Sequence, residues 1–341
     1  MRLGFDGRVF LHEKITGVER YSREIHNNLM NLVDVQLFMP HTHNRYAQHL
    51  WVQTGLPLMA HRSKVDVLFC PVMAAPLLIG KEIPVVVTVH DLSFFQFPEM
   101  YSWSFRNYYQ KLMPWVLRKA ARVITPTSAE KSNIIRRFPF VADKIDAIHE
   151  GVAEHFYFQD KVREHIILAV GSTNKHKNLA ALLNAFAKIT SLIPHRLVIV
   201  GGARSIISAD MRIGEAMSNI PEDRVSLTGY VSDSELADWY NRADLFVFPS
   251  LFEGFGLPPL EAMACGCPVI VSNRSCLPEV CGDAAVYCNP EDVAELAKTI
   301  TELAVDEYRK EALRVSGLQH AAAYTWKIAA EQTIVTINKV L

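Results

Sequence analysis

Short apolar runs alternate with helix-like segments along the whole of this 341-residue chain. The runs are rich in valine, isoleucine and phenylalanine and have the length of strands that are buried on both faces. They lie at residues 2–5, 35–39, 65–69, 84–89, 122–126 and 144–149, and again at 165–170, 196–200, 225–228, 244–248, 268–272 and 285–288. Strands that alternate with helices form parallel sheets covered by helices on both faces. The sequence therefore predicts an α/β fold with two Rossmann-like domains that face each other across a cleft.

The length and the composition agree with two globular domains. A chain of 341 residues with 50% hydrophobic and 21% charged residues can bury two cores of ordinary size. The polar stretch at 156–164 is the expected linker, which predicts a first domain at 1–158, a second at 159–323 and a terminal amphipathic helix at 324–341. The net charge of −1 gives no case for a nucleic-acid partner.

The sequence predicts neither a targeting segment nor a membrane-spanning one. Asp6 interrupts the N-terminus early, and no apolar run approaches the roughly 18 residues of a membrane helix. The six cysteines lack the Cys-x2-Cys spacing of zinc sites, so we expect small buried side chains in a reducing cytoplasm. His41, His43 and His49 belong to a segment without carboxylates, which favours a polar surface loop over a metal cluster.

A strand, a glycine loop and a helix start follow one another at residues 244–261. Gly254 and Gly256 let the backbone approach a ligand closely, and two prolines suit the first turn of a helix. The free amides and the dipole at such a helix start favour an anion such as a pyrophosphate. Glu253 and Glu261 frame the loop, and because helical side chains lean toward the N-terminus, both carboxylates are expected at the same mouth. This combination predicts a nucleotide-sugar pocket; a plain tight turn is the alternative.

Two further candidates directly follow predicted strands. Gly171 opens a loop with Lys175 and Lys177 before a helix, where amides and ammonium groups together can bind phosphate; solvated lysines are the alternative. His90 is suited to hydrogen-bond a sugar hydroxyl, with Asp91 or a backbone carbonyl as its own partner. A purely structural histidine is the competing interpretation.

A helical segment at 102–121 mixes aromatic and basic side chains. It carries Trp103, Phe105, Tyr108, Tyr109 and Trp115, together with Arg106, Lys111, Arg118, Lys119 and, just beyond it, Arg122. Aromatic side chains at the interface and cations at anionic headgroups are typical of peripheral membrane contact. The other interpretation is an ordinary amphipathic helix on the sheet, interrupted near Pro114.

Several longer blocks resemble a known enzyme family. Glu253 to Glu261 matches the Glu-x7-Glu signature of the retaining glycosyltransferases of family 4, which have the two-domain GT-B fold. The resemblance extends to blocks at 16–21, 89–92, 228–236, 261–269 and 277–280, covers nearly the whole chain and is most specific between Gly171 and Asp283. Within the family it points to a mannosyltransferase-like branch.

The resemblance implies roles for individual residues. Glu253, His90 and Lys177 would act on the donor sugar and its leaving diphosphate during catalysis. Binding of the nucleotide sugar is implied for Gly17, Ser172, Lys175, Tyr230, Val231, Gly254, Phe255, Gly256, Leu257 and Glu261. Among these, Tyr230 and Val231 would flank the base, and Glu261 would accept hydrogen bonds from the ribose. His176 and Ser172 stand where relatives carry arginine, which weakens the arginine side of the expected phosphate clamp.

The implied reaction is the transfer of a hexose, mannose from GDP-mannose, to a glycan or lipid-linked glycan with anomeric retention. The first domain would serve the acceptor, the second would bind the nucleotide sugar, and the terminal helix would cross back onto the first domain. No cofactor beyond the nucleotide sugar is expected, and because the sequence has no Asp-x-Asp motif, no essential metal is expected either. The alternatives are a nucleotide-sugar 2-epimerase and a non-catalytic nucleotide-sugar-binding partner.

Overall fold

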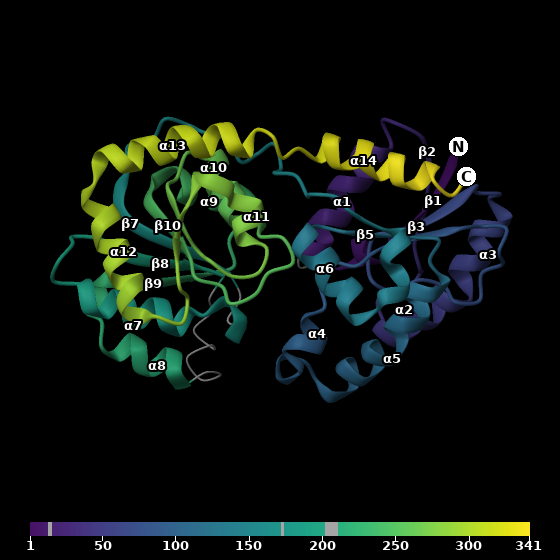
Figure 1. Ribbon diagram of the computed structural model, residues 1–341, viewed down its shortest axis with the longest axis horizontal. Coiled ribbons are helices and arrows are strands. Elements are labelled where there is room, and N and C mark those ends of the chain that lie inside the picture. The colour runs from purple at the N-terminus through teal and green to yellow at the C-terminus, as the bar shows by residue number, and fades with distance from the viewer. Residues whose placement is uncertain (13–15, 172–173, 202–210) are drawn as a thin grey trace. The chain divides into compact units, whose positions relative to one another are not determined.

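A computed structural model describes residues 1–12, 16–171, 174–201 and 211–341 (Figure 1). The chain forms two compact units. Unit 1 comprises Met1–Gly151 and Thr325–Leu341, and unit 2 comprises Val152–Tyr324. The boundary therefore precedes the polar stretch at 156–164 instead of falling inside it. That stretch belongs to unit 2 because Phe156 is buried there against the ring of Tyr240.

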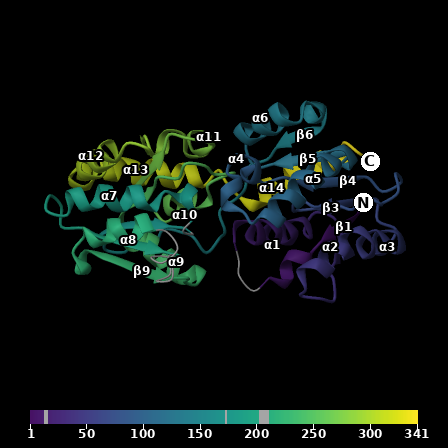
Figure 2. The same cartoon turned by 90° about the horizontal axis from the view of Figure 1, so that it is seen from below.

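Unit 1 contains a parallel six-stranded sheet. Its strands are β1 (Arg2–Asp6), β2 (Asp34–Phe38), β3 (Val67–Cys70), β4 (Val85–Thr88), β5 (Arg122–Thr125) and β6 (Ile145–Ala147). Their spatial order is β2-β1-β3-β4-β5-β6, of which the part from β1 to β6 can be followed in Figure 2. Every residue of β3 and β4 is buried, which explains why these runs show no alternation of polar and apolar side chains.

Helices cover both faces of this sheet (Figure 1). They are α1 (Gly17–Leu29), α2 (Arg45–Gln53), α3 (Gly55–Arg62), α4 (Ser93–Gln96), α5 (Trp103–Lys119), α6 (Ser128–Arg137) and α14 (Trp326–Asn338). The last of these comes from the end of the chain and packs against α1 and β5. The buried Trp326 meets the ring of Tyr21 edge-on, with 5.8 Å between ring centres. The terminal segment is therefore part of the core of unit 1.

Unit 2 contains a second parallel six-stranded sheet. Its strands are β7 (Glu164–Val170), β8 (Arg196–Val200), β9 (Val225–Gly229), β10 (Ala243–Phe248), β11 (Val269–Ser272) and β12 (Val286–Cys288), in the order β12-β11-β10-β7-β8-β9. Its helices are α7 (Leu179–Ile189), α8 (Met211–Ser218), α9 (Asp233–Arg242), α10 (Leu257–Ala264), α11 (Leu277–Cys281), α12 (Val293–Val305) and α13 (Glu307–Ala321). The prediction of two Rossmann-like α/β domains is confirmed.

Both sheets reverse the direction in which successive strands are added. In unit 1, β2 lies on one side of β1, and β3 with all later strands lies on the other. In unit 2, β8 and β9 extend one side of β7, and β10 returns to its other side. Open parallel sheets bind ligands outside the carboxyl ends of the strands that flank such a reversal. We call these places the switch point of unit 1, between β1 and β3, and the switch point of unit 2, between β7 and β10.

Three segments differ from the expectations drawn from the sequence. Helix α5 runs through Pro114 without a break, because Met113, Val116 and Leu117 are buried around the proline and hold the helix on the sheet. His49 lies in α2, not in a surface loop. Helix α13 was not among the expected elements, since its buried side includes a lysine and a glycine and so lacks a clear apolar stripe.

Candidate functional site

Loops at the switch point of unit 2 are hydrogen-bonded to the sheet and to one another. The amide of Gly171, directly after β7, donates to the carbonyl of Val200 at 3.0 Å. The amide of Leu251, after β10, donates to the carbonyl of His176 at 2.7 Å. These bonds bring together the two loops in which the sequence predicts phosphate binding.

Lys177 and Glu253 form an ion pair at this switch point. Nζ of Lys177 lies 2.7 Å from Oε1 of Glu253 and 5.0 Å from the centre of the Phe248 ring. Lys177 ends the 3₁₀ turn η4 (Lys175–Lys177), and Glu253 belongs to the loop between β10 and α10. Their side chains are 16% and 12% exposed, so the pair is shielded but still reached by solvent. The edge of the sheet thus presents an ammonium group and a carboxylate side by side.

Two residues fix the backbone around Lys177. Asn178 adopts a left-handed conformation with φ 57°, and its Nδ2 donates to the carbonyls of Pro249 and Pro290 at 3.2 and 2.7 Å. Gly171 has φ +152°, and a Cβ on it would lie 3.4 Å from Cδ of Lys177. No role for Asn178 was predicted from the sequence, although asparagine is one of the few residues besides glycine that tolerate this conformation.

Gly256 shapes the start of α10. It caps the helix with φ +105°, a conformation that disfavours any side chain, and a Cβ there would lie 2.8 Å from Leu277 Cδ2. The neighbouring carbonyl of Phe255 accepts a hydrogen bond from Cys276 Sγ at 2.9 Å. Phe255 and Leu257 are buried, whereas Gly254 is half-buried. A helix start with prolines in its first turn therefore follows the glycine loop, as the sequence predicts.

The remaining residues predicted to bind the nucleotide differ in how far they are exposed. Glu261 is only 4% exposed, and its Oε2 accepts a hydrogen bond from the hydroxyl of Tyr240 at 3.2 Å. Tyr230 follows β9 with 70% of its surface exposed, and Val231 beside it is half-buried. Lys175 is exposed. Ser172 lies outside the described residues.

His90 lies in unit 1, directly after β4, and both of its ring nitrogens have protein partners. Nε2 is 2.9 Å from the carbonyl oxygen of Pro71, and Nδ1 is 3.5 Å from Oε1 of Glu150. Burial lowers the pKa of His90, but the Glu150 carboxylate, the Pro71 carbonyl and the charge of Asp91 together outweigh burial, so the pKa is raised. Of the two partners expected from the sequence, the backbone carbonyl is found, whereas Asp91 accepts a hydrogen bond from Ser93. Glu150, distant in sequence, was missed.

Gly17 is the first residue of α1 in unit 1. The helix starts with a capping box in which the Thr16 amide donates to Glu19 Oε2 at 3.0 Å. Among the described residues, no atom outside its chain neighbours lies within 4 Å of a Cβ built on Gly17. The described residues therefore leave room beside this glycine for a close backbone approach.

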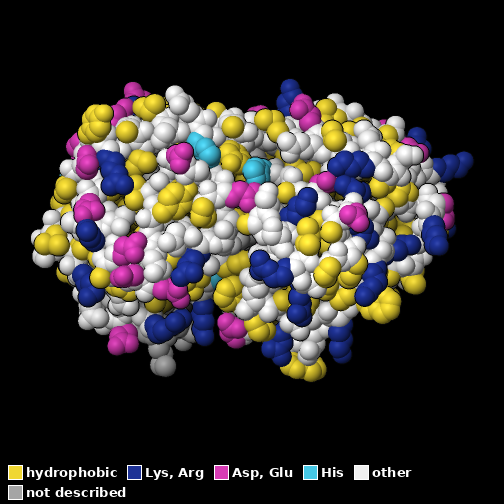
Figure 3. All heavy atoms as spheres, viewed as in Figure 1, with side chains coloured by type: hydrophobic (Ala, Val, Ile, Leu, Met, Phe, Trp, Pro, Cys, Tyr) yellow, Lys and Arg dark blue, Asp and Glu magenta, His cyan; other side chains and the backbone are white. Residues whose placement is uncertain are grey.

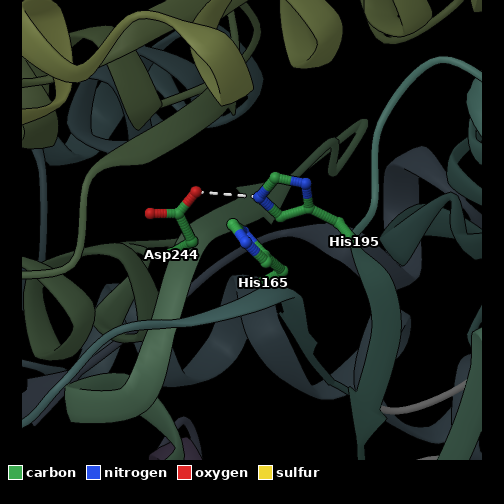
Figure 4. A group of neighbouring side chains, drawn as sticks. All are labelled: His165, His195 and Asp244. Carbon is green, nitrogen blue, oxygen red and sulfur yellow. Dashed lines mark hydrogen bonds and ion pairs between the residues drawn. The ribbon is translucent and has the colours of Figure 1, made fainter.

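One trio of possible metal ligands lies at the opposite edge of the sheet in unit 2. His165, His195 and Asp244 have ligand atoms within 4.8 Å of one another (Figure 4). Asp244 already accepts two hydrogen bonds from Lys310 Nζ, at 3.0 and 2.8 Å, and one ring nitrogen of His195 lies 2.8 Å from it. The ammonium group takes the place that a cation would need, so the geometry describes a buried ion-pair network.

Two units, each with a parallel six-stranded sheet covered by helices, define the GT-B class of fold. Solved structures agree with this fold. A sucrose-phosphate synthase from Thermosynechococcus elongatus superposes with a TM-score of 0.79 at 21% identity, covering 99% of this chain and 98% of that one. WaaG, a glycosyltransferase involved in lipopolysaccharide biosynthesis, superposes with a TM-score of 0.73 at 12% identity, covering 97% and 98%.

Sequence comparisons identify the family. The model described as Glycosyltransferase Family 4 matches residues 9–156, and the model described as Glycosyl transferases group 1 matches residues 153–317. An O-antigen chain mannosyltransferase B from Escherichia coli is 32% identical over 261 residues, which cover 73% of this chain and 68% of that protein. The O-antigen chain mannosyltransferase RfbU from Salmonella typhimurium is 31% identical over 206 residues, covering 60% and 57%. The chain belongs to glycosyltransferase family 4.

Proposed function

We propose that this glycosyltransferase moves mannose from GDP-mannose to a glycan or lipid-linked glycan, with retention of the anomeric configuration. The observation that carries the proposal is the Lys177–Glu253 pair, 2.7 Å apart at the switch point of unit 2. Relatives named as mannosyltransferases at 31–32% identity support the choice of sugar. The nucleotide base follows from the same resemblance.

Lys177 is suited to neutralise the leaving diphosphate. An ammonium group and the amides at the start of α10 supply positive charge where negative charge grows as the glycosidic bond breaks. In the structure, the ammonium group donates a hydrogen bond to the Glu253 carboxylate. A diphosphate that binds Lys177 would release the Glu253 carboxylate to accept hydrogen bonds from the hydroxyl groups of the sugar. This exchange of partners requires neither an enzyme nucleophile nor a metal ion.

His90 is proposed to contact a hydroxyl group of the transferred sugar. Because both ring nitrogens already have protein partners, such a contact would replace the Pro71 carbonyl or the Glu150 carboxylate. Glu261 is proposed to bind the ribose, and its bond with Tyr240 holds it in a single orientation for that role. Tyr230 offers an exposed ring against which a base can stack.

Nucleotide binding tests the proposal directly. GDP, UDP and ADP would be titrated calorimetrically into the wild type, Lys177→Ala and Glu261→Ala, with Lys298→Ala on the outer face of α12 as a matched control. We expect GDP to bind most tightly and both site variants to lose at least tenfold in affinity, while the control keeps it. A preference for UDP would contradict the mannosyl assignment. Absence of nucleotide binding would contradict the proposed function altogether.

Incubation with GDP-mannose alone separates the proposed activity from its alternatives. A transferase releases some sugar to water, a 2-epimerase converts the donor to its epimer, and a binding protein does neither. We expect slow release of mannose and GDP. Conversion to an epimeric nucleotide sugar, or an unchanged donor despite tight binding, would contradict the transferase assignment.

We also propose that α5 contacts the surface of an anionic membrane from the cytoplasmic side. Trp103 and Trp115 are 73% and 63% exposed, and the basic residues Lys111 and Arg118 are exposed on the same helix. Figure 3 shows hydrophobic and basic side chains interspersed over the region where Figure 1 draws α5. Among the described residues, no helix combines the length and apolar character needed to cross a bilayer. A peripheral contact therefore suits this helix.

Vesicle flotation tests this contact. We expect the chain to float with vesicles that contain phosphatidylglycerol and not with pure phosphatidylcholine, and the double variant Trp103→Ser, Lys111→Glu to lose the binding. Tyr308→Ser, a change of an exposed aromatic residue in unit 2, serves as the control. Equal binding to both vesicle types, or none to either, would contradict the contact.

A further inference from the structure

The loop that follows β11 is hydrogen-bonded to the backbone of Glu253. We call this segment, residues 273–276 between β11 and α11, the β11 loop. Within it, Ser275 Oγ donates a hydrogen bond to the carbonyl of Glu253 at 2.8 Å and accepts one from the amide of Glu253 at 3.3 Å. A single hydroxyl group thus engages both backbone polar groups of the residue whose carboxylate pairs with Lys177.

The next two residues extend this contact along the glycine loop. Cys276 Sγ lies 3.2 Å from the carbonyl oxygen of Glu253 and 2.9 Å from that of Phe255. Burial, and next the negative charge of Glu253, raise the pKa of the Cys276 thiol, so the thiol stays protonated and can donate to one of these carbonyls at a time. Leu277 Cδ2 lies 2.8 Å from the position of a Cβ on Gly256. Figure 1 accordingly draws α11 beside α10, the helix that follows the glycine loop.

The β11 loop has its own attachments to the sheet of unit 2. The amide of Asn273 donates to the carbonyl of Cys288 in β12 at 2.9 Å. The amide of Arg274 donates to Oγ of the buried Ser272 at 3.0 Å. Nη2 of Arg274 also lies 2.7 Å from Oε2 of Glu291, but this ion pair is exposed and contributes little. The two backbone donors therefore fix the loop independently of its contact with the glycine loop.

Ser275 adopts a left-handed backbone conformation, with φ 58°. Residues with a Cβ adopt this conformation at a cost, whereas glycine adopts it freely. Among the described residues, four other than glycine have positive φ, and two of them adjoin the Lys177–Glu253 pair: Ser275 on the side of the glutamate and Asn178 on the side of the lysine. Such strain persists where the surrounding structure over-determines it, and it is concentrated at functional sites. Glycine at position 275 would suit the backbone better but would lack the hydroxyl group that holds Glu253.

We infer that Ser275 is a positioning residue for the transfer reaction: its hydroxyl group fixes the backbone of Glu253 and thereby the orientation of the carboxylate toward the sugar. The inference rests on the proposed function, in which Glu253 accepts hydrogen bonds from hydroxyl groups of the sugar. Ser275 acts through Glu253 and does not itself contact the substrate. A displacement of a positioning group by about 1 Å can lower a rate about 10²-fold, so the restraint on this carboxylate has a measurable effect on turnover.

Three substitutions at Ser275 separate the hydroxyl group from the backbone conformation. Ser275→Gly removes the hydroxyl group and suits the left-handed backbone, Ser275→Ala removes the hydroxyl group and keeps the strain, and Ser275→Thr keeps the hydroxyl group but adds a β-branch that this conformation disfavours. Turnover is measured as release of GDP from saturating GDP-mannose. We expect it to fall about tenfold or more in the glycine and alanine variants and to stay within about threefold of the wild type in the threonine variant.

The thermal stability of the same variants should follow the backbone conformation instead. In Ser275→Gly the relief of strain offsets the lost hydrogen bonds, so we expect its Tm within about 2 °C of the wild type, and the Tm of the alanine and threonine variants about 2–4 °C lower. A merely structural role of Ser275 predicts turnover that falls in step with stability, most of all in Ser275→Thr. That order, or wild-type turnover in Ser275→Gly, would overturn the inference.

Asp160→Gly is the matched control. Asp160 is an exposed residue of unit 2 that is also left-handed, with φ 48°, so the same kind of substitution is made away from the pair. It should leave both turnover and GDP affinity unchanged. In Ser275→Gly the GDP affinity should stay within about threefold of the wild type, because Lys177 is retained. A loss of GDP affinity equal to the loss of turnover would show that the β11 loop serves nucleotide binding, against the inference.

A double-mutant cycle tests whether Ser275 acts through Glu253. In the Glu253→Gln background, Ser275→Gly should lower turnover by less than about twofold, because the carboxylate that it positions is already gone. Equal losses in both backgrounds would mean that the two residues act independently and would overturn only this inference. Failure of the proposed function gives a different result: wild-type turnover in Glu253→Gln, or absence of GDP binding in the wild type, would contradict the role proposed for Glu253 and the inference with it.

Discussion

The switch points of the two units differ in what forms them. In unit 2 the backbone dominates: Gly171 and Gly256 have positive φ, Asn178 is left-handed, and Lys177 and Glu253 form an ion pair at the mouth. In unit 1 buried side chains dominate, with Arg8 and Gln48 lining a cavity of about 360 Å³. The same topological rule thus yields one site built on loops and another built into the core.

Because of this difference, changes at the two sites should alter the free energy of unfolding by different amounts. The pair in unit 2 keeps contact with solvent, so changing it disturbs binding more than folding. The carboxylate of Asp6 in unit 1 is fully buried beside Arg8, and removing its partner leaves a charge with no compensation. We therefore expect changes to the buried Asp6–Arg8 pair of unit 1 to affect folding and changes to the Lys177–Glu253 pair of unit 2 to affect turnover.

The largest effect is expected for Arg8→Ala. Leaving Asp6 buried without its cation should lower the free energy of unfolding by about 3–5 kcal/mol. Differential scanning calorimetry would follow the transition of unit 1, with Lys111→Ala, an exposed change, staying within about 0.5 kcal/mol of the wild type. A loss below about 1 kcal/mol would mean that Asp6 is held protonated and that the comparison of buried charges does not hold.

The next largest effect is expected for a change in unit 2, on turnover. Glu253→Gln keeps the shape of the side chain but removes the charge that is proposed to orient the sugar, so turnover should fall about 10²–10³-fold. Affinity for GDP should stay within about threefold, because Lys177 is retained. Steady-state kinetics and calorimetry measure the two quantities, with the exposed Glu302→Gln as the control. A fall in GDP affinity that matches the fall in turnover would show that Glu253 acts on the nucleotide instead of on the sugar.

Residues that belong to continuous motifs could be predicted from the sequence. Gly256 was predicted from a glycine loop before prolines, and the twelve strands from their apolar runs, because such signals depend only on neighbours in the chain. Glu150 as the partner of His90, and Gln48 as part of a cavity, depend on contacts between distant segments. Neither carries a local signal. In unit 1 the sequence therefore predicted His90 but not its partner Glu150, whereas in unit 2 it predicted the glycine loop and both members of the Lys177–Glu253 pair.

A third prediction concerns the pH dependence of stability that Glu130, a buried carboxyl group of unit 1, produces. Burial raises the pKa of Glu130 to about 8, only partly offset by the hydrogen bond from Asn133 Nδ2 at 3.1 Å. The folded chain thus binds a proton that the unfolded chain releases near pH 4.5. Stability from this group is complete below pH 4.5 and is lost as the pH rises toward 8, at up to about 1.4 kcal/mol for each pH unit.

Glu130→Gln mimics the protonated acid and removes this titration. Urea unfolding at pH 5 and pH 8 should show a gain for Glu130→Gln over the wild type that grows with pH, whereas Asp143→Asn, exposed in the same unit, should show no such trend. A gain that is equal at both pH values would show that Glu130 is ionised in the folded chain, as the pair in unit 2 is proposed to be.

The smallest effect compares two glycines at helix starts, one in each unit. Gly256 has φ +105° and a Cβ there would lie 2.8 Å from Leu277, so Gly256→Ala should cost about 1–3 kcal/mol. Gly17 has no described atom within 4 Å of its Cβ position outside its chain neighbours, so Gly17→Ala should change stability by less than about 0.5 kcal/mol. Thermal unfolding of both variants measures the difference in stability, and steady-state kinetics measure whether either change alters a KM. If the backbone at Gly17 approaches a ligand, Gly17→Ala raises a KM without loss of stability; if both stability and KM stay unchanged, only the glycine in unit 2 is required.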